Sequence, residues 1–310
     1  MADFQVTIVG LGVTGTSLGL ALKKASKELR VVGHDRESAA AAAARKVGAV
    51  DATEWNLPKA CRGASILVLA LPLSEIRETL AAVAPDLAPG CLVTDTAPLK
   101  APVLAWAREL LPAQVHFVGG DPIGVRGARE AGADLFSNTT YCLCPEASTA
   151  PEAVDRASDL AQAVGANPRF LDATEHDGLV AGLDQLPFMI SMAVFQAAAS
   201  SPAWREMANL GSARFDRLAG LLGDSPGADL QGARANAANI RRWLDDVQVA
   251  VDGLRTLLDA QQPADEEAIR RLSEARAAWE RHDTATPVVQ PDLKPFSVRR
   301  LLGIPGRRDR

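Results

Sequence analysis

The sequence predicts an α/β domain followed by an all-α domain: an N-terminal Rossmann-type, doubly wound parallel sheet and a C-terminal helical, dimerising domain. Up to Ala173, short β-branched runs alternate with Ala- and Leu-rich amphipathic stretches, which is typical of a parallel sheet covered by helices. Beyond Ala173 the strand signals stop and long helical stretches follow. The length of 310 residues also fits two domains at about 150 residues each. We place them at residues 1–172 and 173–282, followed by a basic, Pro-containing tail at 283–310.

The strands predicted for the first domain are short apolar runs, several of which end at Gly, Pro or Asp, where a doubly wound sheet carries its ligand-binding loops. The predicted strands are residues 5–9, 30–34, 66–70, 92–94, 116–119 and 140–143, with a further short edge strand at 170–171. Helices are predicted between them, including residues 17–29, 37–47, 73–84 and 102–111.

Four long helices are predicted for the second domain, at residues 175–199, 203–222, 230–258 and 265–282. The first is apolar almost all round, which indicates a buried spine of a bundle or a subunit interface. Pro187 should kink it, because proline lacks a backbone donor and clashes with the preceding turn. Trp204, Trp243 and Trp279 lie on these helices, and we expect them to anchor core or dimer packing.

The charge distribution excludes some classes of partner. The formal charge is −5 overall, but residues 287–310 carry six basic and two acidic side chains, so this segment carries +4 and residues 1–286 carry −9. An acidic body gives no electrostatic footprint for nucleic acid. The four cysteines show no C-x-x-C spacing, which indicates buried, reduced thiols and no metal site. We find no signal peptide or membrane span and expect a cytoplasmic protein.

The most specific motif is Gly10-Leu11-Gly12-Val13-Thr14-Gly15, which follows a predicted strand and precedes a predicted helix. In this context the first glycine permits a tight turn, and the second lets a pyrophosphate approach the backbone. The third lets the helix pack closely on the strand, so that the N–H groups at the helix N-terminus face the phosphates. The motif therefore predicts binding of a dinucleotide cofactor.

The choice between NAD and NADP depends on the end of the second strand. Asp35 lies 20 residues after Gly15, where a carboxylate accepts hydrogen bonds from the ribose hydroxyls and repels a 2′-phosphate. This favours NAD. The neighbouring Arg36 leaves NADP possible, because a guanidinium at this position can bind a 2′-phosphate or stack on adenine.

From about residue 4 to 255 the chain resembles the prephenate/arogenate dehydrogenase family. That family carries out NAD(P)-linked oxidative decarboxylation of a cyclohexadienol in tyrosine biosynthesis, typically as dimers joined through the helical domain. The segments that carry the resemblance are Val9-Gly10-Leu11-Gly12, Leu69-Ala70-Leu71-Pro72, Thr94-Asp95-Thr96-Ala97-Pro98-Leu99-Lys100, Val118-Gly119-Gly120-Asp121-Pro122-Ile123-Gly124, Leu135-Phe136, Glu175-His176-Asp177, Leu186-Pro187 and Phe215-Asp216-Arg217-Leu218-Ala219.

The residues expected at the substrate differ from the family pattern. Pro98 stands where the family has a serine, and Asp121 stands where it has the histidine that hydrogen-bonds the substrate hydroxyl. The segment Asp184-Gln185-Leu186-Pro187-Phe188 replaces Ser-His-Leu-Pro-His, whereas Lys100 and Arg217 match the family. These changes remove imidazoles and add negative charge, so a doubly anionic substrate should bind less well.

We therefore predict a catalytic pair, Asp121 and Lys100, with Arg217, Gln185 and Asp184 on the substrate side and no metal. Asp121 would accept the hydroxyl proton if burial beside Asp95 raises its basicity; the alternative is a carboxylate that caps a turn before Pro122. The residues predicted to bind the cofactor are Gly10, Leu11, Gly12, Val13, Thr14, Gly15, Asp35, Arg36, Leu71, Pro72, Thr96 and Ala97.

Three of the other predicted roles have alternatives. Lys100 would orient either the substrate or the loop backbone. Arg217 would clamp a substrate carboxylate or cover a solvated helix face. His176 is expected near the start of the long helix, with Thr174 as N-cap, in a neutral capping or packing role rather than as a ligand.

The function predicted from the sequence is that of an NAD(P)-dependent oxidoreductase similar to prephenate dehydrogenase, acting on a small molecule as a homodimer. Two alternatives follow from the changed residues at the substrate. One is a related dehydrogenase that acts on a different, less charged hydroxy acid or cyclic alcohol. The other is a non-catalytic NAD-binding regulator, which the loss of both histidines and the basic tail would allow.

Overall fold

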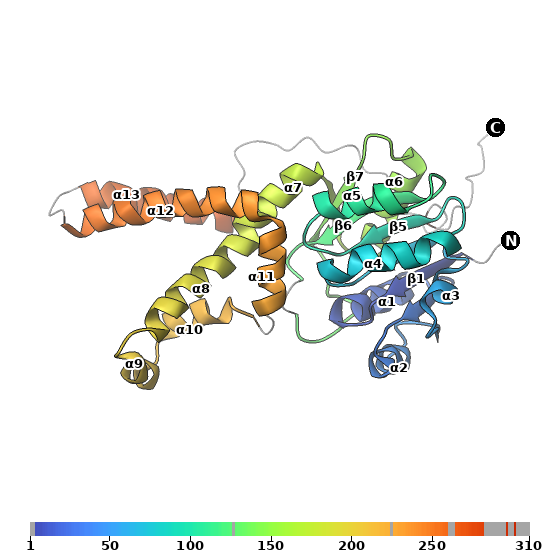
Figure 1. The fold of residues 1–310 in the computed structure, drawn as a ribbon, viewed down its shortest axis with the longest axis horizontal. Helices are drawn as coiled ribbons and strands as arrows, with labels where there is room; N and C mark the ends of the chain where they lie inside the picture. Colours follow the sequence, from blue (N-terminus) through green and yellow to red (C-terminus); the bar gives the residue numbers. More distant parts are fainter. Residues whose placement is uncertain are drawn as a thin grey trace.

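A computed structural model describes residues 4–125, 128–223, 226–259 and 264–281, together with Phe296 and Leu301. The predicted fold class is confirmed: a mostly parallel sheet covered by helices precedes a helical region (Figure 1). Most of the tail at 283–310 lies outside the described residues. Leu301 is fully buried in the core of the sheet domain, and Phe296 packs against the same core.

The sheet has eight strands in the order β3-β2-β1-β4-β5-β6-β7-β8. Every neighbouring pair is parallel except β6 and β7, which are antiparallel, a pairing that the sequence did not predict. The strands are β1 (Gln5–Val9), β2 (Arg30–His34), β3 (Ala52–Thr53), β4 (Ile66–Leu69), β5 (Leu92–Asp95), β6 (His116–Pro122), β7 (Thr140–Pro145) and β8 (Asn167–Phe170).

The central strands are buried on both faces, which explains why they read as continuous apolar runs. Their side chains alternate between two core clusters. Val6, Ile8 and Ile66 point into one cluster, and Leu67 and Leu69 point into the other. Helices that follow the strands cover both clusters, as a doubly wound sheet requires.

The helices of the first domain are α1 (Val13–Ala25), α2 (Ser38–Lys46), α3 (Leu57–Cys61), α4 (Leu73–Val83), α5 (Ala101–Leu110) and α6 (Pro151–Ala163). The strand β3 and the helices α3 and α6 were not predicted from the sequence. Helix α1 begins four residues earlier than predicted, because Gly12 is its N-cap. The strand β6 runs three residues further than predicted, so Asp121 lies in the sheet.

In the helical domain, α7 (Ala173–Val180), a π-helical segment (Ala181–Gln185) and α8 (Leu186–Ala199) form one continuous helix of 27 residues. The π segment ends two residues before Pro187. Its wider turn accommodates a residue that lacks an N–H and crowds the preceding turn. By length and composition this helix could cross a membrane, with a mean hydropathy of 1.5, and only 28% of its most apolar window is buried within the chain.

Two helices predicted as continuous are each interrupted. Gly211, with φ of 63°, separates α9 (Trp204–Leu210) from α10 (Ala213–Gly220), and Asn236 separates α11 (Pro226–Ala235) from α12 (Ala237–Asp259). Helix α13 spans Ala264–Glu280. In Figure 1, α8 and the α12–α13 pair extend away from the sheet domain as two arms.

The predicted tryptophan anchors behave differently from one another. Trp204 forms an aromatic cluster with Phe195 and Phe215. Trp243 covers Gly182 so closely that a Cβ there would lie 2.7 Å from the indole ring. Trp279, at 70% exposure, anchors no core among the described residues, so a dimer contact for it stays a prediction.

Candidate active site

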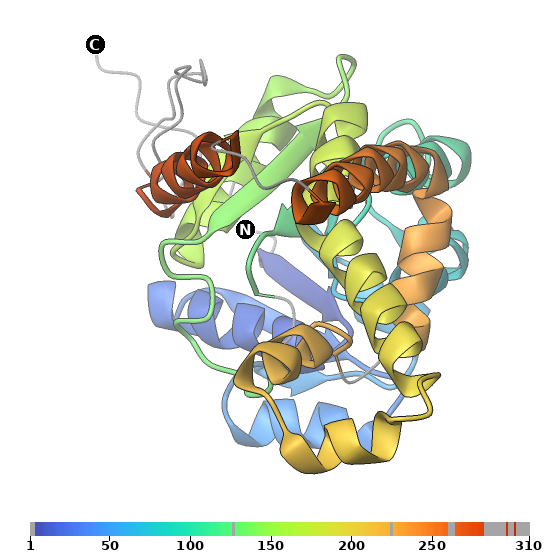
Figure 2. The ribbon, with the colours of Figure 1, turned by 90° about the vertical axis from the view of Figure 1, so that its left-hand side faces the viewer.

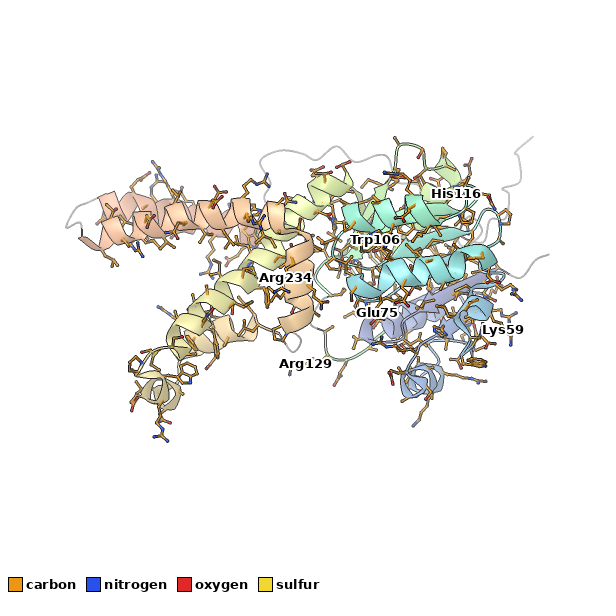
Figure 3. All side chains as sticks on the ribbon, viewed as in Figure 1. Lys59, Glu75, Trp106, His116, Arg129 and Arg234 are labelled. Carbon is orange, nitrogen blue, oxygen red and sulfur yellow. The ribbon has the colours of Figure 1, made fainter. Side chains whose placement is uncertain are left out.

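The candidate residues gather where the parallel strands β1, β4, β5 and β6 end, at the edge of the sheet that faces the helical domain. In Figure 3, His116 labels the start of β6, on the side of the sheet domain that lies away from the helical domain. Glu75 labels the start of α4, on the side that faces Arg234 of α11. Figure 2 looks from the helical domain toward this edge and shows α8, α10 and α11 on the viewer's side of the strands. Ligands of doubly wound sheets bind at the carboxyl ends of the strands.

The glycine loop has the local geometry that a dinucleotide requires. Gly10 has φ of +91°, and a Cβ there would lie 2.3 Å from the Ala70 oxygen. At Gly15 a Cβ would lie 1.8 Å from the Gly10 oxygen, so only glycine lets α1 pack this closely. Nothing lies within 4 Å of a Cβ built on Gly12, which is the N-cap of α1 and makes no side-chain cap. The first N–H groups of α1 are therefore approachable by a phosphate.

Asp35 links the second strand to this loop. One carboxylate oxygen accepts a hydrogen bond from the Leu11 N–H at 2.7 Å, and the other accepts from the Glu37 N–H at 2.8 Å. The neighbouring Arg36 extends away toward α4, where its Nη1 lies 3.0 Å from Glu75 Oε1. Asp35 thus holds the loop in place, while Arg36 is engaged in an exposed ion pair.

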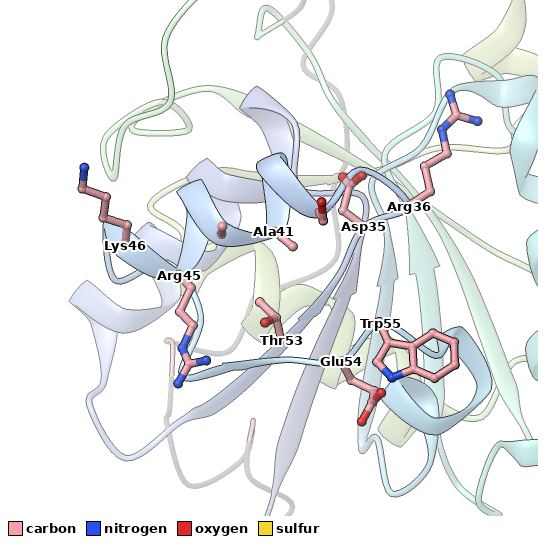
Figure 4. A pocket seen from close by; sticks show the side chains of 10 residues that line it. Asp35, Arg36, Ala41, Arg45, Lys46, Thr53, Glu54 and Trp55 are labelled. Carbon is pink, nitrogen blue, oxygen red and sulfur yellow. The ribbon is translucent and has the colours of Figure 1, made fainter.

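Two open pockets meet at Asp35 and Arg36. One, of about 560 Å³, is lined by residues of the glycine loop and of the β4–α4 connection, including Gly10, Gly12, Leu71 and Pro72. The other, of about 720 Å³, lies between α2 and the segment that follows β3, where Figure 4 shows Arg45, Thr53 and Trp55. The first pocket is therefore lined by four of the predicted cofactor residues as well as by Asp35 and Arg36. Its volume is that of a typical small-molecule site.

A buried ion pair lies at the end of β5. Lys100 and Asp95 have 0% side-chain exposure, and Lys100 Nζ donates to Asp95 and to the Gly120 oxygen. Asp95 also accepts from the N–H groups of Ala97 and Gly120, and burial, partly opposed by Lys100, raises the pKa of Asp95. Lys100 therefore fixes the backbone of the β6 end, which fits the second of its two predicted roles.

Asp121 is buried in β6, opposite Cys142 of β7, rather than in a turn. Its Oδ2 lies 3.2 Å from Nε2 of His176, and both side chains are 1% exposed. The close approach of β6 to β5 depends on Gly120, where a Cβ would lie 2.6 Å from the backbone carbonyl oxygen of Asp95. The end of β6 is thus built to hold a carboxylate inside the protein.

His176 lies in the first turn of α7 and is buried. The N-terminus of α7 is capped by Asp172, whose carboxylate accepts hydrogen bonds from the N–H groups of Thr174 and Glu175. The expectation of Thr174 as N-cap is therefore wrong. His176 Nδ1 lies 3.0 Å from Asp177 Oδ1. Burial lowers the pKa of His176, but its close contacts with Asp121, Asp177 and Cys142 outweigh burial and raise the pKa to about 10. These contacts favour the charged form of the imidazole.

Asp177 and Asn236 connect this cluster to the helical domain. Asp177 accepts from the N–H groups of Lys100 and Ala101 at 2.7 and 2.9 Å, and so caps α5 from another helix. Asn236 Nδ2 donates to the backbone carbonyl oxygen of Asp177 and to Gln185 Oε1, both at 2.8 Å. Neither residue was assigned a role from the sequence. The only signal was that Asp177 belongs to the family-like segment Glu175-His176-Asp177.

The neighbouring Tyr141 completes the buried surface of the cluster. It is 1% exposed, and burial together with Asp95 and Asp121 raises the pKa of its hydroxyl above the ordinary range. Its hydroxyl has no hydrogen-bond partner among the described residues. The Tyr141 phenol is therefore neutral and supplies no further charge to the site.

The structure brings some predicted substrate residues together and not others. Gln185 is buried at the edge of the polar cluster, whereas Asp184 of the same π segment is exposed. Arg217 is exposed on α10, which packs on α8, and makes no ion pair within the described part of the chain. Thr96 and Ala97 follow β5 directly, with the Ala97 N–H bound to Asp95.

Among the described residues there is no group of three or more metal-ligating side chains. All four cysteines are free and buried. Burial is the main cause that raises the pKa of the Cys61 thiol to about 12 and of the Cys91 thiol to about 11, so these two are neutral packing residues.

Comparison with known sequences identifies relatives over most of the chain. The family model "Prephenate dehydrogenase, nucleotide-binding domain" matches residues 18–169. A prephenate dehydrogenase from Lactococcus lactis is 29% identical over 96% of this chain and 85% of its own length. A probable prephenate dehydrogenase from Streptomyces niveus is 30% identical over 81% of this chain and 69% of its own length.

Solved structures agree with these relatives. Prephenate dehydrogenase from Aquifex aeolicus, in complex with hydroxyphenyl propionate and NAD⁺, superposes with a TM-score of 0.79 over 91% of this chain and 99% of its own, at 18% identity. Arogenate dehydrogenase from Synechocystis superposes with a TM-score of 0.73 over 90% of this chain and 100% of its own, at 28% identity. The likeness therefore includes both the sheet domain and the helical domain.

Proposed function

Because the chain belongs to the prephenate dehydrogenase family and is an NAD(P)-dependent dehydrogenase of that type, we propose that it oxidises and decarboxylates a cyclohexadienol such as prephenate or arogenate. One observation carries the proposal. A glycine loop open to a pyrophosphate and a buried carboxylate at the end of β6 lie at the same edge of one sheet. The first can hold a dinucleotide, and the second can accept a proton.

The proposed chemistry assigns a separate role to each end of the site. NAD, when bound by the glycine loop, supplies the hydride acceptor. The carbinol C–H bond breaks with its electron pair, and the hydroxyl proton moves to Asp121 as the C=O bond forms. The bond from the ring to its carboxylate then breaks, CO₂ leaves, and its electrons make the ring aromatic. The proton returns to the oxygen, which becomes the phenol of the product.

The charges at the site favour arogenate over prephenate. Gln185 is neutral, and Asp121 and Asp184 add carboxylates where the family pattern has histidine and serine. Prephenate carries two carboxylates and no cation. Arogenate carries an ammonium group as well, so its net negative charge is smaller by one unit and its repulsion by Asp121 is weaker. Arg217 on α10 remains our candidate for a carboxylate of the substrate, with Lys100 as a positioning residue.

The geometry around Asp35 favours NAD over NADP. Its carboxylate is fixed by two backbone N–H groups beside the pocket, where it would bind ribose hydroxyls and repel a 2′-phosphate. Arg36 is paired with Glu75 across the same pocket, so its charge is already partly balanced.

Steady-state assays of the purified protein with prephenate and with arogenate, each with NAD and NADP, test the proposal. We expect turnover with NAD, and a higher kcat/KM for arogenate. Binding of NAD without turnover of either compound would contradict the proposal and favour a non-catalytic regulator. Turnover of prephenate alone would contradict the charge argument while leaving the reaction type in place.

We also propose a cytoplasmic homodimer joined through the helical domain. The 27-residue helix is apolar but mostly unburied within the chain, and Leu179 and Leu183 on it are 43% and 55% exposed. A second copy would cover this surface. Light scattering coupled to gel filtration should give twice the chain mass of 32.7 kDa, and Leu183→Glu should shift the protein toward monomer.

A further inference from the structure

The histidine that the family pattern places at the end of β6 is absent here, yet an imidazole still lies beside that position. It comes from α7. His176 stands between two carboxylates, with Nε2 3.2 Å from Asp121 Oδ2 and Nδ1 3.0 Å from Asp177 Oδ1. All three residues are at most 4% exposed. The His176 imidazole of the helical domain thus contacts Asp121 of the sheet and Asp177 of its own helix.

The surroundings of His176 determine its charge. Asp121 of β6, Asp177 of its own helix and Cys142 of β7 all contact the ring, and Tyr141 of β7 lies beside Asp121. Lys100 is bound to Asp95 and to the Gly120 backbone oxygen and is therefore already paired. Asp177 is stabilised by two N–H groups at the start of α5. His176, with Nε2 3.2 Å from Oδ2, is thus a charge partner of Asp121.

We propose that His176 is a positioning residue for the dehydrogenation, which acts by keeping Asp121 ionised and oriented as the proton acceptor. This inference rests on the proposed function. A carboxylate at 1% exposure tends to take up a proton unless a cation lies beside it. The imidazolium supplies that cation and keeps its own proton throughout. The hydroxyl proton moves to Asp121 during hydride transfer and returns to the product oxygen after CO₂ has left.

The pair also explains how this chain tolerates Asp121 in place of the family's histidine. An isolated carboxylate would be a poor substitute, because it would be desolvated without a partner. With His176 beside it, the site retains one imidazole and gains one negative charge relative to the family pattern. Asp177 makes this possible, because it fixes His176 Nδ1 and leaves Nε2 for Asp121.

The kinetic test compares His176→Gln with His116→Gln, the same substitution at the opposite end of β6. For His176→Gln we expect kcat to fall at least tenfold and the acidic limb of the kcat/KM profile to move up by about one pH unit, with the Kd for NAD unchanged. For His116→Gln we expect no change. A His176→Gln enzyme that is slower but keeps the wild-type pH profile would overturn the inference, because a purely structural role predicts that result.

A second measurement does not depend on turnover. The chain has four histidines, so ¹⁵N NMR of histidine-labelled protein can identify His176 by its loss in His176→Gln. We expect both ring nitrogens to be protonated at pH 8 and to titrate near 10, and to titrate at lower pH in Asp121→Asn. A neutral ring at pH 8 would overturn the inference. If the ring is charged but no cyclohexadienol is turned over, the proposed function fails and the ion pair stands.

Discussion

The two halves of the candidate site are built in different ways. The cofactor half is mainly backbone: three glycines within six residues shape one loop, and Asp35 holds it in place. The substrate half is side chains from β5, β6, α7 and the α11–α12 break, joined by buried hydrogen bonds. A loop of glycines can keep its ligand while the other half changes. The contrast shows how one scaffold retains a cofactor and alters its substrate pocket.

The largest effect should come from Asp121→Asn in the substrate half. An amide has nearly the same shape as the carboxylate but does not accept a proton at neutral pH, so kcat should fall about 10²- to 10⁴-fold. The Kd for NAD, measured by tryptophan fluorescence, should stay within twofold of wild type. Asp86→Asn, at an exposed ion pair with Arg62, is the matched control and should change neither quantity. A kcat within threefold of wild type would contradict the assignment of proton transfer to Asp121 in the substrate half.

Gly12→Ala probes the cofactor half without disturbing the fold. A Cβ at Gly12 meets nothing within 4 Å, so the melting temperature should stay the same. The methyl group would occupy the space through which a pyrophosphate approaches the start of α1, and the Kd for NAD should rise at least tenfold. Gly253→Ala on α12 also meets no neighbour and should leave NAD binding unchanged. An unchanged Kd in Gly12→Ala would place the cofactor elsewhere.

The polar cluster should also make folding stability depend on pH. The folded-state pKa of His176 is raised from 6.5 to about 10, so its stabilising contribution is fully present below about pH 6.5 and is lost as pH rises through 10. Urea unfolding at pH 6, 8 and 10 should show a loss on the order of 2 kcal/mol that is absent in His176→Gln. Equal losses in both proteins would mean that another group titrates.

The contrast between the halves also explains how much the sequence revealed. The order of strands and helices, the glycine loop and Asp35 follow from local patterns, because each depends on residues close together in the chain. The single antiparallel pair, β6 with β7, was missed because apolar runs carry no information about strand direction. Helix α6 was missed although Pro151 at its first position is a typical start signal.

The polar cluster was harder to predict because its contacts join residues far apart in the chain. Asp121 and His176 are 55 positions apart, and Asp177 and Asn236 are 59 positions apart. His176 looked like a packing residue at the start of a helix, since nothing near it in the sequence shows that β6 brings a carboxylate to its Nε2. Lys100 was recognised from its family-like segment, but its complete burial could not be predicted, because it involves Gly119 of β6, where a Cβ would lie 3.0 Å from Lys100 Cδ.

The smallest predicted effect concerns Asp35, where the cofactor half sets its choice of dinucleotide. Asp35→Ser keeps a hydrogen-bonding group near the ribose and removes the charge that opposes a 2′-phosphate, so the preference for NAD over NADP should fall about tenfold in kcat/KM. The loss of the Leu11 N–H partner should also raise both KM values. Arg36→Ala is the informative companion. Because Arg36 is paired with Glu75, removing it should leave the NAD preference within threefold of wild type. If Arg36→Ala abolishes the use of NADP by Asp35→Ser, Arg36 leaves Glu75 to bind the 2′-phosphate, and the ion pair seen here is a state of the cofactor half that the ligand itself can displace.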